Sequence, residues 1–271
     1  MIARTGLTGL RFEKCSKDIE GLTKPTMIKS NDFTIPFQMI VDTYGIPTYK
    51  EVNPAYFSVV TFPFFFGVMF GDIMHGAILM TFGIYLVFSK RQEGQLSKMM
   101  EDLRYLFLLM GFFSLFCGFI YNDYTSMTTK VFDPCYSIPE EPGSDGKIYA
   151  HQKEDCVYPF GMDPTWYLSV QEITFLNSFK MKISVIYGVS QMLLGVCMKG
   201  FNAVYFKRWV ELLVEVTTQI VLMLALFGFM DYLIIVKWGT DWEEATKDTN
   251  EAPPAIIQTM ITMFIQGGVK S

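Results

Sequence analysis

The sequence of 271 residues is too apolar for a soluble domain of this size, because 51% of its residues are hydrophobic, 16% are aromatic and only 18% are charged. A polytopic membrane protein is the simplest interpretation. The net charge of −5 argues against a nucleic-acid partner, and the sequence contains neither a Walker-type glycine loop nor a zinc-like cluster of Cys and His. We therefore expect no nucleotide hydrolysis, no cofactor and no metal site in this chain.

Residues 1–54 carry mixed charges, and we expect them to form a cytosolic lead-in to the membrane. Three prolines limit any helix in the second half of this segment to residues 37–44. The last of them, Pro54, suits the first turn of the apolar helix that follows, because a residue in that turn needs no backbone N–H.

The segment 53–89 is the most apolar part of the chain, and apart from tyrosines its ionisable side chains are Asp72 and His75. As a single helix it would be roughly 55 Å long, nearly twice the hydrocarbon core of about 30 Å. We therefore predict two spans, 55–70 and 77–88. A hairpin turn at 71–76 would join them, because glycines on both sides favour a turn there.

The stretch 89–104 contains four Lys or Arg side chains, and the positive-inside tendency places it in the cytosol. A third span follows at 103–121, so that residues 55–121 hold spans one to three. From 122 to 179 the sequence is acidic and contains Pro and Gly throughout. We expect this segment to form one large lumenal loop.

Residues 180–237 hold the predicted fourth and fifth spans, 183–198 and 209–236. We expect the tail, 238–271, to be lumenal or interfacial. Its apolar run 255–265 is too short to cross, so it is either an interfacial helix or the approach to a further span. The predicted fold is an all-α polytopic transmembrane bundle of about five spans with one large lumenal loop.

Four stretches of the sequence are distinctive: TYKEVNP with VVTFPFFFGVMFGDIMHG (48–54 and 59–76), LLMGFFSLFCGFIYND (108–123), YPFGMDPTW (158–166) and NSFKMKISVIYGVSQM (177–192). They resemble the large a subunit of the eukaryotic vacuolar-type proton ATPase (V-ATPase). The resemblance implies the N-terminal part of that subunit's membrane domain. A large cytosolic domain would precede it, and further spans that face the rotor ring would follow, so the chain would be a fragment.

The resemblance also implies a role as a stator scaffold that braces the proton channel and takes part in acidifying a lysosome-like vacuole, Golgi or contractile vacuole. The implied partners are the other membrane-sector subunits, including the proteolipid ring, and the lipid bilayer. A rotary proton motor needs a fixed positive charge at mid-membrane, and none of the five predicted spans has a Lys or Arg near its centre. Two alternatives are a short structural paralogue without pumping activity and an autonomous small membrane transporter.

Six polar residues are candidates for a proton path or for structural roles: Asp72, His75, Asn122, Asp123, Glu211 and Glu215. An ionisable side chain at membrane depth suggests function, but Asp72 and His75 can instead cap the hairpin turn, which is the interpretation that we favour. If this turn meets the end of the third span, Asp123 would join them. The resulting cluster would be either structural or part of a water-filled vestibule.

Glu211 and Glu215 lie one helical turn apart near the start of the fifth span. They form either a relay of carboxylates or a cytosolic helix end that pairs with Lys207 and Arg208, and we favour the second. Asp231, in the same span, is better explained by interhelical hydrogen bonding or an interface position than by a proton path.

Cys135 and Cys156 are the two cysteines of the predicted lumenal loop. An oxidising lumen would allow them to form a disulfide, although they can equally be free thiols. We favour the disulfide.

Overall fold

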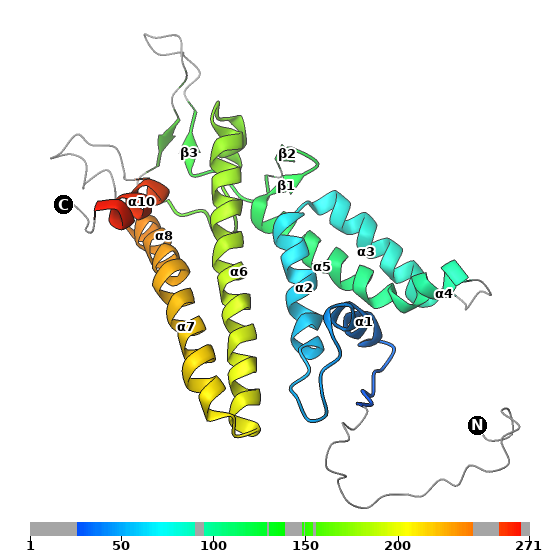
Figure 1. Cartoon of the computed structure of the whole chain (residues 1–271). Helices are drawn as coiled ribbons and strands as arrows, with labels where there is room; N and C mark the ends of the chain where they lie inside the picture. Colours follow the sequence, from blue (N-terminus) through cyan, green and yellow to red (C-terminus); the bar gives the residue numbers. More distant parts are fainter. Residues whose placement is uncertain are drawn as a thin grey trace, which may run out of the picture.

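The computed structural model describes residues 26–89, 95–128, 130–138, 148, 150–153, 156–240 and 255–266. It is mostly helical (Figure 1). The α-helices are α1 (Ile35–Tyr44), α2 (Ala55–Met69), α3 (Ile73–Phe88), α4 (Gln95–Asp102), α5 (Arg104–Tyr121), α6 (Glu172–Tyr205), α7 (Thr217–Met223), α8 (Phe229–Gly239) and α10 (Ile256–Gln266). Shorter elements are the 3-10 helix η2 (Pro164–Leu168) and the antiparallel pairs β1 (Asp123–Tyr124) with β2 (Met127–Thr128) and β3 (Tyr136–Ser137) with β4 (His151–Gln152).

Two π-helical segments, η3 (Glu211–Val216) and η4 (Leu224–Gly228), join α7 and α8 into one continuous helix, Glu211–Gly239. This helix has 29 residues, α6 has 34 and α5 has 18, and all three are long and apolar enough to cross a membrane. Helices α2 and α3 are apolar but have only 15 and 16 residues. The prediction of a helical chain with membrane-spanning segments is confirmed for these three helices, while the number of five spans stays a prediction.

The turn between α2 and α3 is shorter than the predicted turn at 71–76. Helix α3 already begins at Ile73, so His75 lies in its first turn and Asp72 is the residue that caps it. The glycines flanking the predicted turn suggested a longer break. Gly76, however, lies inside α3. Its missing side chain allows α3 to pack closely against α5 and does not mark a turn.

Helix α6 extends far beyond the predicted span 183–198. It begins at Glu172, so the last part of the predicted lumenal loop is helical. Lys180 and Lys182 mark an edge of the apolar sequence, but lysine is a good helix former and does not end a helix. The charged residues therefore predicted where the apolar segment begins, but not where the helix begins. Similarly, α4 lies within the predicted loop 89–104.

Helices α3 and α5 form a close antiparallel pair. Glycines at seven-residue intervals line their interface: Gly76 and Gly83 on α3, and Gly111 and Gly118 on α5. A Cβ atom at Gly111 would lie 2.4 Å from the backbone nitrogen of Met80, and one at Gly76 would lie 2.5 Å from that of Leu115. The two backbones can approach this closely only because these positions lack side chains, which is typical of helix pairs in membranes.

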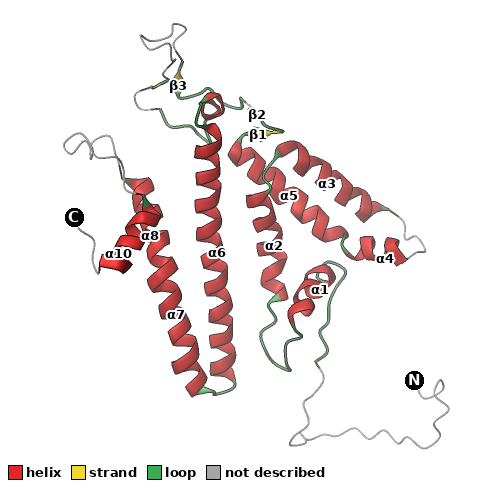
Figure 2. Ribbon diagram, turned by 45° about the horizontal axis from the view of Figure 1, so that its top comes forward, coloured by secondary structure: helices red, strands yellow, loops and turns green. Residues whose placement is uncertain are grey.

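The remaining helices form a second layer beside this pair. Helix α6 and the helix Glu211–Gly239 lie side by side as a long antiparallel hairpin in both views (Figures 1 and 2). Helix α2 packs between α6 and α5, with the rings of Phe64 and Tyr187 5.0 Å apart in an edge-to-face contact. Helix α1 contacts α2 and α5, and its Phe37 is completely buried.

A buried apolar cluster lies where the ends of α2 and α5 meet α6 and the segment that precedes it. It consists of Val68, Cys117, Tyr121, Met162 and Leu176. We call this part of the molecule the loop end, because the described residues between α5 and α6 lie there (Figure 1). The opposite end, which holds α1 and the turn after α6, is the α1 end.

Candidate functional site

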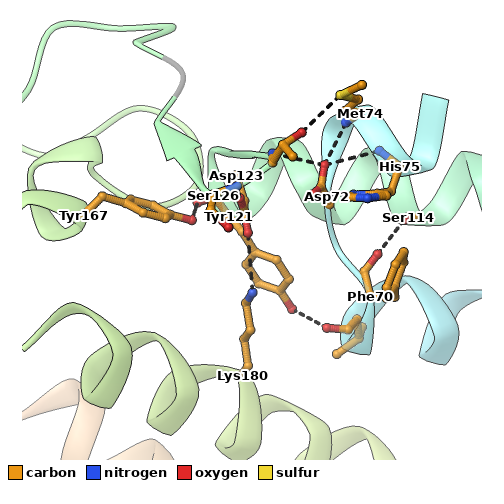
Figure 3. A network of polar contacts seen from close by, with 12 residues as sticks. Phe70, Asp72, Met74, His75, Ser114, Tyr121, Asp123, Ser126, Tyr167 and Lys180 are labelled. Carbon is orange, nitrogen blue, oxygen red and sulfur yellow. Dashed lines mark hydrogen bonds and ion pairs between the residues drawn. The ribbon is translucent and has the colours of Figure 1, made fainter. Parts of the chain in front are cut away.

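The turn between α2 and α3 is held by hydrogen bonds from both sides (Figure 3). The Oδ1 atom of Asp72 accepts from the backbone amides of Met74 at 2.8 Å and His75 at 3.3 Å. Its Oδ2 atom lies 2.7 Å from Nδ1 of His75. The hydroxyl of Ser114 donates to the carbonyl of Phe70. Asp72 thus satisfies amides that would otherwise lack partners at the start of α3.

The same turn meets the end of α5 and the start of α6. The backbone amide of Thr125 donates to Oδ1 of Asp72 at 3.4 Å. Asp123, two residues earlier, accepts from the amide of Ser126 at 2.9 Å, and its Oδ2 lies 3.9 Å from Nζ of Lys180. The structure therefore brings Asp72, His75 and Asp123 together, and adds Lys180, which was not among the predicted candidates.

Two tyrosines connect this cluster to the apolar core below it. The Tyr121 hydroxyl donates to the carbonyl of Val68 at 3.0 Å, and the Tyr167 hydroxyl donates to the carbonyl of Tyr121 at 2.9 Å (Figure 3). The ammonium group of Lys180 lies 4.7 Å from the centre of the Tyr121 ring, a cation–π distance. These contacts join α2, α5, η2 and α6.

Asn122 ends α5 in the left-handed conformation, with φ of 53°. Its side chain is almost fully buried and donates to the carbonyl of Met162 and to the hydroxyl of Tyr158, the latter at 3.3 Å. Asparagine adopts this conformation more readily than most residues, and it can also supply the two donors. Asn122 therefore both ends the helix and holds the following segment against it.

Asp163 performs a similar function farther along the same segment. Its Oδ1 atom caps η2 by accepting from the backbone amide of Thr165 at 2.8 Å and from its hydroxyl at 2.7 Å. Its Oδ2 atom accepts from the amide of Cys135 at 2.8 Å. Cys135 forms a disulfide with Cys156, with the two Cα atoms 5.5 Å apart. Asp163 thus attaches the disulfide-linked hairpin to the segment that Asn122 holds.

The surroundings of the cluster shift two pKa values. Burial alone would raise the pKa of Asp72, but hydrogen bonds from the His75 side chain and from the amides of His75 and Met74, with the charge of His75, outweigh burial and lower that pKa below its ordinary value of 3.8. Burial, assisted by the nearby carboxylates of Asp123, Glu172 and Asp72, raises the pKa of the Tyr167 hydroxyl. Tyr167 therefore stays protonated and remains a hydrogen-bond donor.

We expect replacement of Asp72 to change how stability depends on pH. Because its pKa is lower in the folded state, Asp72 contributes stability that is fully present above pH 3.8 and is lost as the pH falls through the folded-state pKa. Asp72→Asn keeps a cap acceptor but removes this titration, whereas Asp72→Ala should also lose about 1 kcal/mol at neutral pH. Thermal unfolding in detergent between pH 3 and pH 6 tests this. An Asn variant with the wild-type pH dependence would contradict it.

Glu211 and Glu215 lie at the α1 end, far along the helix from this cluster. Glu211 accepts a hydrogen bond from Arg208 at 3.4 Å. Glu215 pairs with Lys199 of α6 rather than with Lys207, because the antiparallel hairpin brings α6 beside it. The predicted pairing with Arg208 is thus observed, and the predicted pairing with Lys207 is replaced by one between helices.

Reversing the charges of Lys199 and Glu215 tests how much this pair contributes to the stability of the protein. Both side chains are partly exposed, so we expect Lys199→Glu or Glu215→Lys alone to lower the free energy of unfolding by only about 1 kcal/mol. The double reversal should recover most of that loss. A double-mutant cycle of thermal unfolding measures it, and additive losses would show that the two side chains do not interact.

Among the residues that the structure describes, no group of three or more His, Cys, Asp or Glu side chains is placed to hold a metal ion. The cluster at the loop end instead consists of polar groups that bond to one another and to backbone ends. Sequence reasoning missed four of its members: Tyr121, Asp163, Tyr167 and Lys180. Only Asp163 had a recognisable signal, because Asp-Pro-Thr is a typical start of a helical turn.

Comparison with known proteins identifies the family. Residues 8–271 match the model of the V-type ATPase 116kDa subunit family. The chain is 40% identical over 252 residues to the "Vacuolar proton translocating ATPase 100 kDa subunit" of Dictyostelium discoideum, covering 90% of this chain and 30% of that protein. It is 38% identical over 261 residues to the human "V-type proton ATPase 116 kDa subunit a 3", covering 89% of this chain and 31% of that protein. The bovine "V-type proton ATPase 116 kDa subunit a 2" is 37% identical over 272 residues, and the match covers 90% of this chain and 31% of that protein.

The chain thus spans about 30% of the length of these relatives. The match extends over nearly all of it, including the segments that form both the helices and the polar cluster. The chain therefore belongs to the V-type ATPase 116 kDa subunit family.

Proposed function

We propose that this chain is part of the membrane domain of a V-type proton ATPase a subunit, where it is a stator scaffold that braces the proton channel. The observation that carries this proposal is the family match over residues 8–271, since the relatives are named as proton-translocating or proton ATPase subunits. Proton pumping belongs to the complete subunit within its complex. The complex would acidify an endomembrane compartment, and the partners would be other membrane-sector subunits, including the proteolipid ring.

The proposed topology has five crossing segments, formed by α2, α3, α5, α6 and the helix Glu211–Gly239. The loop end faces the lumen and the α1 end faces the cytosol. Two observations support this orientation. The basic stretch 89–104 favours the cytosol, and the loop end carries a disulfide, which an oxidising lumen would preserve.

A scaffold role fits the polar residues better than a proton path does. Asp72 is engaged in capping α3, and Glu211 and Glu215 pair with Arg208 and Lys199. A relay needs carboxylates that pass protons to one another, whereas each of these is paired with a cation or with the start of a helix. The five crossing segments also lack a Lys or Arg near their centres, so the charge required by a rotary motor must come from elsewhere in the complex.

Affinity purification of the tagged full-length protein from native membranes tests the assignment. We expect proteolipid subunits to co-purify, and vesicles from cells depleted of this protein to lose ATP-dependent acidification measured with a pH-sensitive dye. Re-expression of the wild-type protein should restore acidification. Unchanged acidification after depletion, with no proteolipid in the purified sample, would contradict the assignment.

Cysteine labelling tests the topology separately. Gln95→Cys and Asp145→Cys, each in a background without other reactive thiols, should react with a membrane-impermeant maleimide from opposite sides of sealed vesicles. Labelling of both positions from one compartment would exclude the proposed arrangement while leaving the family membership intact.

A further inference from the structure

We infer that this bundle fits a bilayer thinner than an ordinary one, with a hydrocarbon core of about 24 Å rather than about 30 Å. The inference rests on the proposed function, because it assumes the five crossing segments. It is drawn from the apolar belt, which we define as residues 55–69, 73–88, 105–121, 183–198 and 216–236. The partner of this belt would be phospholipid with short acyl chains.

The two short helices set the first limit on thickness. Helix α2 has 15 residues and α3 has 16, so they are about 22 Å and 24 Å long. Asp72 fixes the end of this pair at the loop end, where it caps α3. Neither helix reaches across a core of about 30 Å, even if it stands perpendicular to the membrane.

The apolar segment of α6 has the same length as the two short helices. Helix α6 has 34 residues, but only 16 of them lie between Lys182 and Lys199, a rise of about 24 Å. In the helix Glu211–Gly239, 15 residues lie between Glu215 and Asp231, a rise of about 22 Å, and the apolar run 232–236 follows Asp231. This helix is therefore the longest apolar segment, and a long helix fits a thin bilayer by tilting.

Lysine at a helix end can often reach the membrane surface with its long side chain, which would hide a mismatch in length. Here two lysines of α6 are held in place. Lys199 is paired with Glu215 at the α1 end, and Lys180 lies beside Asp123 and over the ring of Tyr121 at the loop end. Lys199 thus marks the edge of the belt at the α1 end, and Lys180 lies two residues outside its edge at the loop end.

Contacts between α2 and α6 show that their apolar segments lie level with each other. At the α1 end, the amide of Val52 donates to Oδ1 of Asn202 at 3.0 Å, just before α2 begins. At the loop end, the hydroxyl of Ser184 lies 3.2 Å from Sδ of Met69, the last residue of α2. Helix α2 is therefore matched to the apolar part of α6, and together they form one continuous belt.

The inclination of α3 and α5 further reduces the membrane thickness that these two helices can cross. Both helices are inclined to α6 in the two views (Figures 1 and 2). Between Arg104 and Asp123, α5 and its cap contribute 18 residues, or about 27 Å along the helix axis, and the inclination makes the distance across the membrane shorter. Helices α2, α3 and α5 and the apolar part of α6 therefore fall short of about 30 Å.

Apolar side chains on the belt are open to the surroundings, so acyl chains can contact them directly. Residues more than a third exposed include Phe57, Ile78, Phe82, Met192, Val221 and Leu222. A bilayer that is too thick must thin against this surface, which costs free energy. This cost favours membranes like that of the endoplasmic reticulum, about 27 Å, over the plasma membrane, about 32 Å.

Reconstitution in phosphatidylcholines of increasing chain length tests the inference. The full-length protein, with every free cysteine other than Cys117 replaced by serine, is placed in vesicles whose lipids carry monounsaturated chains of fourteen to twenty-two carbons. Cys117 is a buried free thiol, so its labelling by a fluorogenic maleimide on heating reports unfolding. We expect labelling to be at least threefold slower with fourteen or sixteen carbons than with twenty-two. Equal rates, or the slowest rate with twenty or twenty-two carbons, would overturn the inference.

A pair of variants shows whether the polar edge sets the preferred thickness. Lys199→Leu with Glu215→Leu removes the edge at the α1 end, and should move the slowest labelling to longer chains. The matched control, Arg208→Gln with Glu211→Gln, removes the neighbouring pair but keeps that edge, and should leave the optimum unchanged. If the leucine variant fails to fold, the chain-length series of the wild-type protein decides the question by itself.

Labelling at positions 95 and 145 in the same vesicles separates the two possible failures. Opposite-side labelling in every lipid, with no preference for short chains, would overturn the thin-bilayer inference and leave the proposed topology standing. Same-side labelling would instead overturn the proposed topology.

Discussion

Gly111→Ala is expected to destabilise the protein by about 2–3 kcal/mol, although alanine is the better helix former. The added Cβ atom would lie 2.4 Å from the backbone nitrogen of Met80 and 2.6 Å from its Cα atom. These are backbone atoms, so the overlap is relieved only by moving α3 away from α5. That movement would also weaken the other close contacts of the pair, including those at Gly76 and Gly118.

Gly195→Ala is the matched control, because it makes the same change on α6 where no atom lies within 4 Å of the added Cβ. We expect a small stabilisation of up to about 1 kcal/mol, so the two substitutions should have opposite signs. Heat-induced labelling of Cys117 in detergent measures both. Equal effects at the two positions would contradict the close packing of α3 against α5.

Asn122→Ala is expected to cost about 3 kcal/mol, because it removes two properties of one residue. The left-handed conformation becomes unfavourable by about 1 kcal/mol, and the buried carbonyl of Met162 loses a hydrogen-bond donor, which costs a further 1–3 kcal/mol. Asn122→Gly removes only the side-chain donor, since glycine tolerates the positive φ. The glycine variant should therefore be about 1 kcal/mol more stable than the alanine variant.

Limited proteolysis of residues 156–171, combined with thermal unfolding, measures the consequence for the loop end. Both variants should be cleaved faster than the wild-type protein, because Asn122 holds Met162 against the end of α5. Asp133→Ala, an exposed position in the same part of the chain, serves as the control and should behave like the wild type. Identical stability of the alanine and glycine variants would show that the backbone conformation contributes nothing.

The capping role of Asp72 illustrates how far sequence reasoning reached. Its position between glycines in an apolar segment predicted a turn, and a turn is present, although it is shorter than expected. The sequence could predict that Asp72 lies near Asp123 only if the turn meets the end of α5, because this depends on how α2, α3 and α5 pack. Lys180 gave no signal at all, since its distance from Asp123 results from the placement of α6.

The sequence by itself determined the apolar segments, the helical class of the chain, its family resemblance and the approximate ends of α1, α2 and α5. These follow from composition, proline positions and hydrophobic length, which are local properties. Only the tertiary structure decided the full extent of α6, the pairing of Glu215 with Lys199 and the glycine contacts between α3 and α5. The physical reason is that each of these depends on which surfaces meet in space: lysine continues a helix wherever packing supports it, and a glycine reveals its role only when a second backbone lies against it.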